Sequence, residues 1–96
     1  MSGLEIIKQN RMQILSIAMR HGAERVRAFG SVVRQEEQPD SDIDFLVKMQ
    51  KGHDLLDLIG LGQELENLLH KKTDIVSEEE LSPYLKTRIL QEAVFI

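Results

Sequence analysis

The chain has 96 residues, of which 42% are hydrophobic and 29% charged, a size and composition typical of one folded globular domain. A net charge of -4, three phenylalanines, one tyrosine and no tryptophan argue against direct nucleic-acid binding, which usually requires a basic surface and stacking aromatics. The absence of cysteine excludes disulfides and thiolate metal sites. Apolar runs fall short of the ~20 residues of a membrane span, and the N-terminus lacks a signal-peptide pattern, so we expect a cytoplasmic protein without membrane contact.

The first third of the chain predicts a helix, a strand and a short helix. Apolar residues recur at helical spacing over residues 4–20, and Gly22 follows as a stop. Polar and apolar residues then alternate over residues 25–29, as in a strand. Ser31 is a suitable N-cap for a short helix ending near Gln35.

The middle of the chain predicts a covered strand followed by an amphipathic helix. A polar loop over residues 36–41 precedes a strand over residues 42–49, whose second half is apolar on both faces. After a turn, Asp54 is positioned to cap a leucine-rich helix over residues 55–70. We expect Gly60 and Gly62 to mark close packing of this helix against a strand.

The last third predicts a short strand over residues 73–76 and a helix that begins at Ser82-Pro83, an N-cap followed by proline. The resulting order of elements indicates an α/β domain with a small sheet. The C-terminal end carries Tyr84, Leu85, Phe95 and Ile96, so we expect this end or the outer face of a flanking helix to contact another chain in a homo- or hetero-oligomer.

Two carboxylates at the start of the second strand suggest a metal site. Asp42 and Asp44 are two residues apart, so on a strand their side chains point to the same face. Two like charges at the start of an apolar strand oppose folding unless a cation lies between them, and hard cations such as Mg²⁺ prefer carboxylate oxygens. Asp74, at the start of the third strand, is the candidate for a third carboxylate.

The turn after the first strand suggests a phosphate site beside these carboxylates. Antiparallel pairing of the strands at 25–29 and 42–49 would bring Gly30-Ser31 next to the two aspartates. Gly30 allows close approach of the backbone to a ligand, and Ser31 opens a helix whose free N–H groups favour phosphate. A phosphate site and a metal site would then face one ligand.

The pattern of Gly30-Ser31, Arg34, Ser41-Asp42-Ile43-Asp44 and a later strand aspartate, Asp74, resembles the DNA-polymerase-beta-type nucleotidyltransferase superfamily. Within it, the chain is similar to the minimal nucleotidyltransferases (MNT proteins), often encoded beside HEPN-domain proteins as toxin–antitoxin pairs. The resemblance covers nearly the whole chain, including residues 55–70 and 81–85. One departure is Gln35, which follows Arg34 where the family commonly has glycine.

The resemblance implies one minimal nucleotidyltransferase domain over residues 1–96, an α/β fold with a small mixed three-stranded sheet flanked by helices. It implies that Asp42, Asp44 and Asp74 are catalytic ligands of two Mg²⁺ ions, for which Mn²⁺ can substitute. Gly30 and Ser31 would bind the triphosphate of ATP, with Arg34 and Ser41 as further nucleotide contacts. The implied reaction transfers AMP to a hydroxyl, such as a tyrosine of a HEPN ribonuclease toxin, so that the chain acts as the antitoxin.

Several alternatives compete with this interpretation. Asp42 and Asp44 could form an ordinary solvated strand end, and Asp74, taken by itself, could be an ordinary polar strand start. Arg34 could be a surface residue paired with Glu36 or Glu37. A calcium loop starting at Asp40 lacks the required glycine and final glutamate, and Gly60-Leu61-Gly62 lacks the third glycine of a dinucleotide motif.

Rival functions also remain. A binding module could mask its partner sterically, without catalysis. Transfer to a small molecule is disfavoured because the chain lacks a second domain to bind one.

Overall fold

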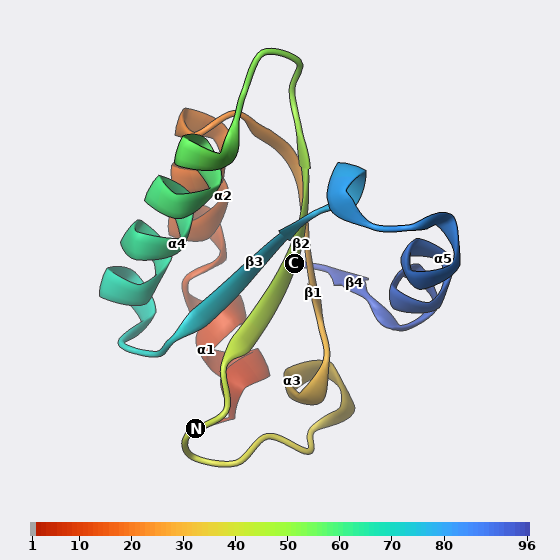
Figure 1. Ribbon diagram of the computed structural model, residues 1–96. Helices are drawn as coiled ribbons and strands as arrows, with labels where there is room; N and C mark the ends of the chain where they lie inside the picture. The colour runs from red at the N-terminus through yellow and green to blue at the C-terminus, as the bar shows by residue number, and fades with distance from the viewer. Residues whose placement is uncertain (1) are drawn as a thin grey trace.

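A computed structural model describes residues 2–96 of the chain. The elements, in order, are α1 (Gly3–Gln9), α2 (Arg11–Arg20), β1 (Ala23–Phe29), α3 (Ser31–Arg34), β2 (Ile43–Met49), α4 (Leu55–Leu69), β3 (Thr73–Ser77), the short 3-10 helix η1 (Glu78–Glu80), α5 (Pro83–Glu92) and β4 (Val94–Phe95). Helices α1, α2 and α4 lie on one face of the sheet, and α5 lies on the other (Figure 1). Within residues 2–96, no helix is both long and apolar enough to cross a membrane.

The four strands form a mixed sheet in the order β3-β2-β1-β4. Strand β1 pairs antiparallel with both β2 and β4, whereas β2 and β3 are parallel and are joined by the crossover helix α4. The expected mixed α/β sheet is therefore confirmed, but it has four strands where three were expected. The missed strand, β4, contains two residues, too few for an alternating pattern to reveal it.

The main core lies between the sheet and the helices α1, α2 and α4. Ile43, Phe45 and Val47 alternate along β2 and are fully buried in this core, together with residues such as Ile14 and Leu65. Because side chains alternate along a strand, Asp44 and Leu46 point to the opposite face, the one on which α5 lies. The core thus fixes which face of β2 presents Asp44.

The helix expected over residues 4–20 is broken at Asn10. The side-chain amide of Asn10 donates to the Ile6 carbonyl at 2.8 Å, and its backbone departs from helical geometry with a φ of -107°. Asparagine side chains compete with the backbone for such bonds, which explains two short helices instead of one. Gly22 ends α2 with a φ of +87°, as expected of a helix stop.

The start of α3 also differs from expectation by one residue. Gly30 occupies the N-cap position with a φ of +80°, and Ser31 is the first helical residue, not the cap. Only glycine adopts this backbone conformation without strain. The helix ends at Gln35, whose left-handed backbone (φ 58°, ψ 37°) is the geometry that glycine favours.

The two later helices are capped as predicted but are less buried than their apolar patterns indicate. Asp54 caps α4 through the backbone N–H groups of Leu56 and Asp57, and Ser82 caps α5. In α4, however, Leu55 and Ile59 remain exposed, because the core covers only the face of Leu61, Leu65 and Leu69. In α5, no residue is buried.

The two glycines of α4 serve two different contacts. Gly62 packs against Ile75 of β3, as expected for close packing on a strand, whereas Gly60 faces the ring of His21 at the end of α2.

Candidate active site

The three predicted carboxylates lie together at one end of the sheet. Asp42 directly precedes β2, and Asp44 is its second residue. In the parallel pairing of β2 with β3, Asp44 is the register partner of Asp74. Adjacent strands are about 4.8 Å apart, and register partners on parallel strands point to the same face. The fold therefore places Asp42, Asp44 and Asp74 on one face.

Gly30 lies against this carboxylate cluster. Phe29, the last residue of β1, pairs with Asp44, so the chain turns into α3 directly beside β2. A Cβ atom added at Gly30 would overlap Oδ2 of Asp44. Position 30 therefore requires glycine for two independent reasons, its positive φ and the adjacent carboxylate. The predicted contact between the glycine turn and the aspartates is present.

The electrostatics of Asp44 reflect its neighbours. The pKa of Asp44 is raised to about 6, chiefly by burial and then by the negative charges of Asp74 and Asp42. Arg34 opposes this effect, while Glu92 adds to it. The balance is unfavourable for an ionised Asp44, and a nearby positive charge would favour the ionised form.

The donor set fits a hard divalent cation. All three side chains offer carboxylate oxygens, the ligands that Mg²⁺ prefers. Within residues 2–96, no three acidic or histidine side chains already converge as ligands of one ion. Joint coordination of one ion would therefore require side chains of the cluster to change their orientation.

Glu92, at the end of α5, contacts the same site and was missed by the sequence analysis. Its Oε1 atom accepts a hydrogen bond from the Gly30 backbone N–H at 2.8 Å and one from Nη1 of Arg34 at 2.6 Å. Arg34 also donates from Nε to Glu36 at 3.3 Å. The hydrogen bond to Glu36, followed by the charge of Glu92, raises the pKa of Arg34. The sequence-based pairing of Arg34 with Glu36 is thus present, along with a partner from the far end of the chain.

Residues 12–96 match the family described as Polymerase beta, Nucleotidyltransferase. The chain belongs to this family of nucleotidyltransferases. It is 43% identical over 88 residues to a Methanocaldococcus jannaschii protein assigned as a protein adenylyltransferase, covering 92% of this chain and 95% of that protein. It is 36% identical to the protein adenylyltransferase MntA of Thermococcus cleftensis, covering 80% and 78% of the two chains.

Solved structures agree with this assignment. A structure described as a minimal nucleotidyltransferase superposes with a TM-score of 0.90 and 47% identity, covering 100% of this chain and 97% of that one. The fold also matches a toxin–antitoxin structure with AMP-PNP, with a TM-score of 0.77 and 22% identity over 90% of this chain and 71% of that one. A third match, at 0.70 and 20%, is a tri-AMPylated Shewanella oneidensis HEPN toxin in complex with an MNT antitoxin, covering 92% and 69%.

The remaining predicted contacts of the nucleotidyltransferase have less support from geometry. Ser31 is half-exposed and adjoins Gly30, in keeping with a place at a phosphate. The Ser41 hydroxyl instead accepts the Gln38 backbone N–H at 2.8 Å and thereby closes the loop before β2. Roles in nucleotide binding for both residues stay predictions.

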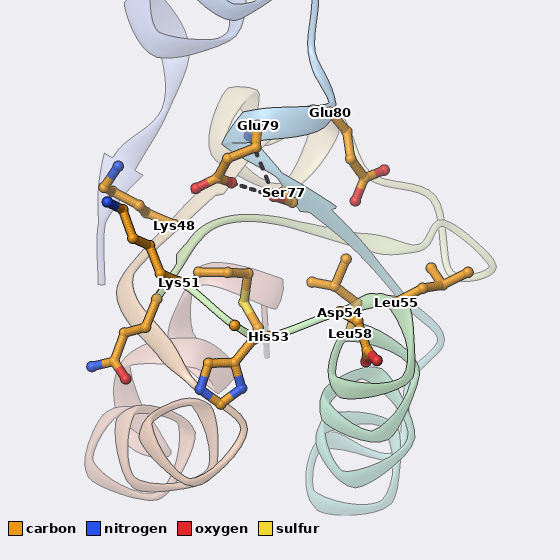
Figure 2. A pocket seen from close by; sticks show the side chains of 12 residues that line it. Lys48, Lys51, His53, Asp54, Leu55, Leu58, Ser77, Glu79 and Glu80 are labelled. Carbon is orange, nitrogen blue, oxygen red and sulfur yellow. Dashed lines mark hydrogen bonds between the residues drawn. The ribbon is translucent and has the colours of Figure 1, made fainter.

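A cavity of about 630 Å³ lies at the other end of β2, away from the carboxylates. Figure 2 shows its lining, in which Lys48 and Lys51 lie on one side and Glu79 and Glu80 on another. None of the predicted site residues lines it. The candidate active site is therefore the carboxylate end, where the paired acids and the glycine turn lie together.

Proposed function

We propose that this nucleotidyltransferase transfers AMP from ATP to a hydroxyl group of a HEPN-domain partner protein and thereby acts as an antitoxin. The observation that carries the proposal is the grouping of Asp42, Asp44 and Asp74 on one sheet face beside Gly30. Relatives named protein adenylyltransferases support the type of reaction. The fold match to an MNT antitoxin in complex with an AMPylated HEPN toxin supports the class of partner.

The carboxylates provide the binding site for divalent metal. Asp42 and Asp44 would hold two Mg²⁺ ions, and Asp74 would share one of them. When bound, the ions neutralise the triphosphate and make the acceptor hydroxyl a better nucleophile. The raised pKa of Asp44 supports this assignment, because a nearby cation would offset both the burial and the repulsion that raise this pKa.

The chain's own groups orient the nucleotide and receive the proton. The Gly30 N–H would donate to an oxygen of the β- or γ-phosphate, and Ser31 would lie beside it. The acceptor oxygen then attacks the α-phosphorus in line, the bond from this phosphorus to the bridging oxygen breaks, and pyrophosphate leaves. Asp74 would assist removal of the hydroxyl proton, because its exposed side chain lies on the edge strand β3, where an incoming acceptor can reach it.

The proposal assigns the acceptor hydroxyl to another protein chain. Several large apolar side chains of the C-terminal segment are exposed, as predicted for a contact with another chain: Tyr84 (69%), Leu85 (47%), Val94 (41%) and Phe95 (63%). Ile96, by contrast, packs partly against the core. Because Glu92 of the same segment touches Gly30, a partner docked here would lie next to the active site.

The experiment that tests the proposal separates transfer from steric masking. Asp74→Asn is nearly isosteric, so it should preserve partner binding while removing a negative ligand. A loss of ~2–4 kcal/mol of transition-state stabilisation would slow transfer on the order of 100- to 1000-fold. We expect the variant to bind the HEPN partner, to leave it without an AMP adduct in mass spectrometry, and to neutralise it poorly on co-expression. Full neutralisation without any adduct would establish the steric mask instead.

A further inference from the structure

The carboxylate of Glu92 occupies the position that the proposed function assigns to a phosphate oxygen. Its Oε1 atom accepts the Gly30 N–H at 2.8 Å and lies 2.6 Å from Nη1 of Arg34. A backbone N–H and a guanidinium that converge on one anionic oxygen form a typical phosphate contact. A triphosphate oxygen and Glu92 cannot both accept the single hydrogen of Gly30.

The placement of Glu92 follows from strand pairing. In the antiparallel pairing of β4 with β1, Arg27 lies opposite Phe95 and Ala28 opposite Val94. Continuing this register by two residues places Glu92 opposite Gly30. The pairing of the two-residue strand β4 with β1 therefore places the Glu92 carboxylate beside Gly30, although 62 positions separate Glu92 and Gly30 in the sequence.

Helix energetics do not explain an acid at this position. Glu92 is the last residue of the ten-residue helix α5, where the partial negative charge of the helix end disfavours a carboxylate. The helix has no basic residue in its last turn to offset this. The favourable contacts of Glu92 are those with Gly30 and Arg34 at the nucleotide site.

We propose that Glu92 is a gate on the triphosphate site, which its carboxylate closes until an incoming nucleotide displaces it. This inference rests on the proposed function, since it takes Gly30 as a phosphate contact. Opening requires rotation of one side chain that is 30% exposed, on a helix without buried residues. Displacement also frees Arg34 to turn from Glu92 toward the triphosphate. Glu92 thereby raises the nucleotide concentration that is needed to occupy the site.

The test is the affinity for MgATP, measured by isothermal titration calorimetry at physiological salt. If the site is free in about one-tenth of molecules, Glu92→Gln should tighten binding about tenfold, or about 1.4 kcal/mol. Glu36→Gln is the matched control, because Glu36 pairs with the same arginine but does not contact Gly30. We expect its affinity to stay within about twofold of wild type.

A second variant separates the effect of blocking the Gly30 N–H from the effect of the negative charge at position 92. Glu92→Asp keeps the negative charge but is one methylene shorter, so its carboxylate should lose reach to the Gly30 N–H and the affinity for MgATP should rise. Unchanged or weaker binding in both Glu92 variants, with wild type binding and transferring AMP, would overturn the gate alone. Equal tightening in Glu36→Gln would overturn it too, because general charge would then suffice. Failure of every protein to bind MgATP would overturn the proposed function and the gate with it.

Discussion

Neutralising Asp44 should stabilise the fold in the absence of metal, and the effect should depend on pH. Asp44 has a folded-state pKa of about 6 against an ordinary value of 3.8, chiefly because of burial and then because of Asp74 and Asp42. Such a difference corresponds to about 3 kcal/mol for a group fully removed from water. Asp44 is only half-buried, so solvent screening reduces the expected gain to about 1 kcal/mol.

The sign follows from proton linkage. A raised folded-state pKa means that the native state binds the proton more tightly than the unfolded state. Below pH 3.8, Asp44 is protonated in both states and costs nothing. Between pH 3.8 and about 6, the stability that protonation provides is lost, and above pH 6 the full cost of the ionised group remains. Asp44→Asn removes this cost, so the difference from wild type should grow from near zero at pH 4 to about 1 kcal/mol at pH 7.5.

The assay is thermal unfolding followed by circular dichroism at both pH values, without metal. For a domain of this size, about 1 kcal/mol raises Tm by roughly 4–8 °C. Asp40→Asn, a neutralised acid in the exposed loop before β2, is the control for net charge and should change Tm little. Mg²⁺ with ATP should then stabilise wild type but not Asp44→Asn, because a ligand that binds only the native state raises its stability. If Asp44→Asn were destabilising at pH 7.5, or kept the full Mg²⁺–ATP shift, the assignment of Asp44 would be wrong.

Three further predictions concern residues around the site. Gly30→Ala should lose about 1–3 kcal/mol of stability together with ATP binding, whereas Gly52→Ala, at a similar φ of +88° but in open space, should lose stability alone, as unfolding and calorimetry would show. Glu78→Gln should cost about 3 kcal/mol in chemical denaturation, because it leaves Arg27 poorly paired in a buried site (2.9 Å in the wild type); a loss under 1 kcal/mol would contradict this. Gln35→Gly should raise stability by up to about 1 kcal/mol, since Gln35 has a left-handed backbone, and a decrease would show that its side chain matters more.

The sequence predicted the parts of the site that depend on local geometry. The spacing of Asp42 and Asp44 places them on one face of any strand, and Gly30 ends a recognisable strand. Asp74 was assigned from its place at a strand start and from the family resemblance. Its pairing with Asp44 depends on the register of two parallel strands joined through α4, which no local pattern specifies.

The place of Glu92 at the site could not be predicted from the sequence. Its contact with Gly30 depends on β4, which has two residues and therefore no periodicity to detect. An acid at the end of a predicted helix was the one local signal, because it opposes the helix dipole. Similarly, the exposed residues of α4 and α5 look like core residues in the sequence. Burial depends on how much of each helix the sheet covers, and this coverage is a property of the tertiary structure.

The two faces of the sheet differ in how much they stabilise the fold, and this difference explains how a small domain tolerates a destabilising acidic cluster. The helices α1, α2 and α4 bury Ile43, Phe45 and Val47 on one face, and this core supplies most of the hydrophobic stabilisation. On the other face, α5 contributes no buried residue. The repulsion around Asp44 therefore acts on strand β2, which the buried side chains on its opposite face hold in place. The side chains to which the two proposals assign movement, the exposed carboxylates and Glu92, lie outside this core.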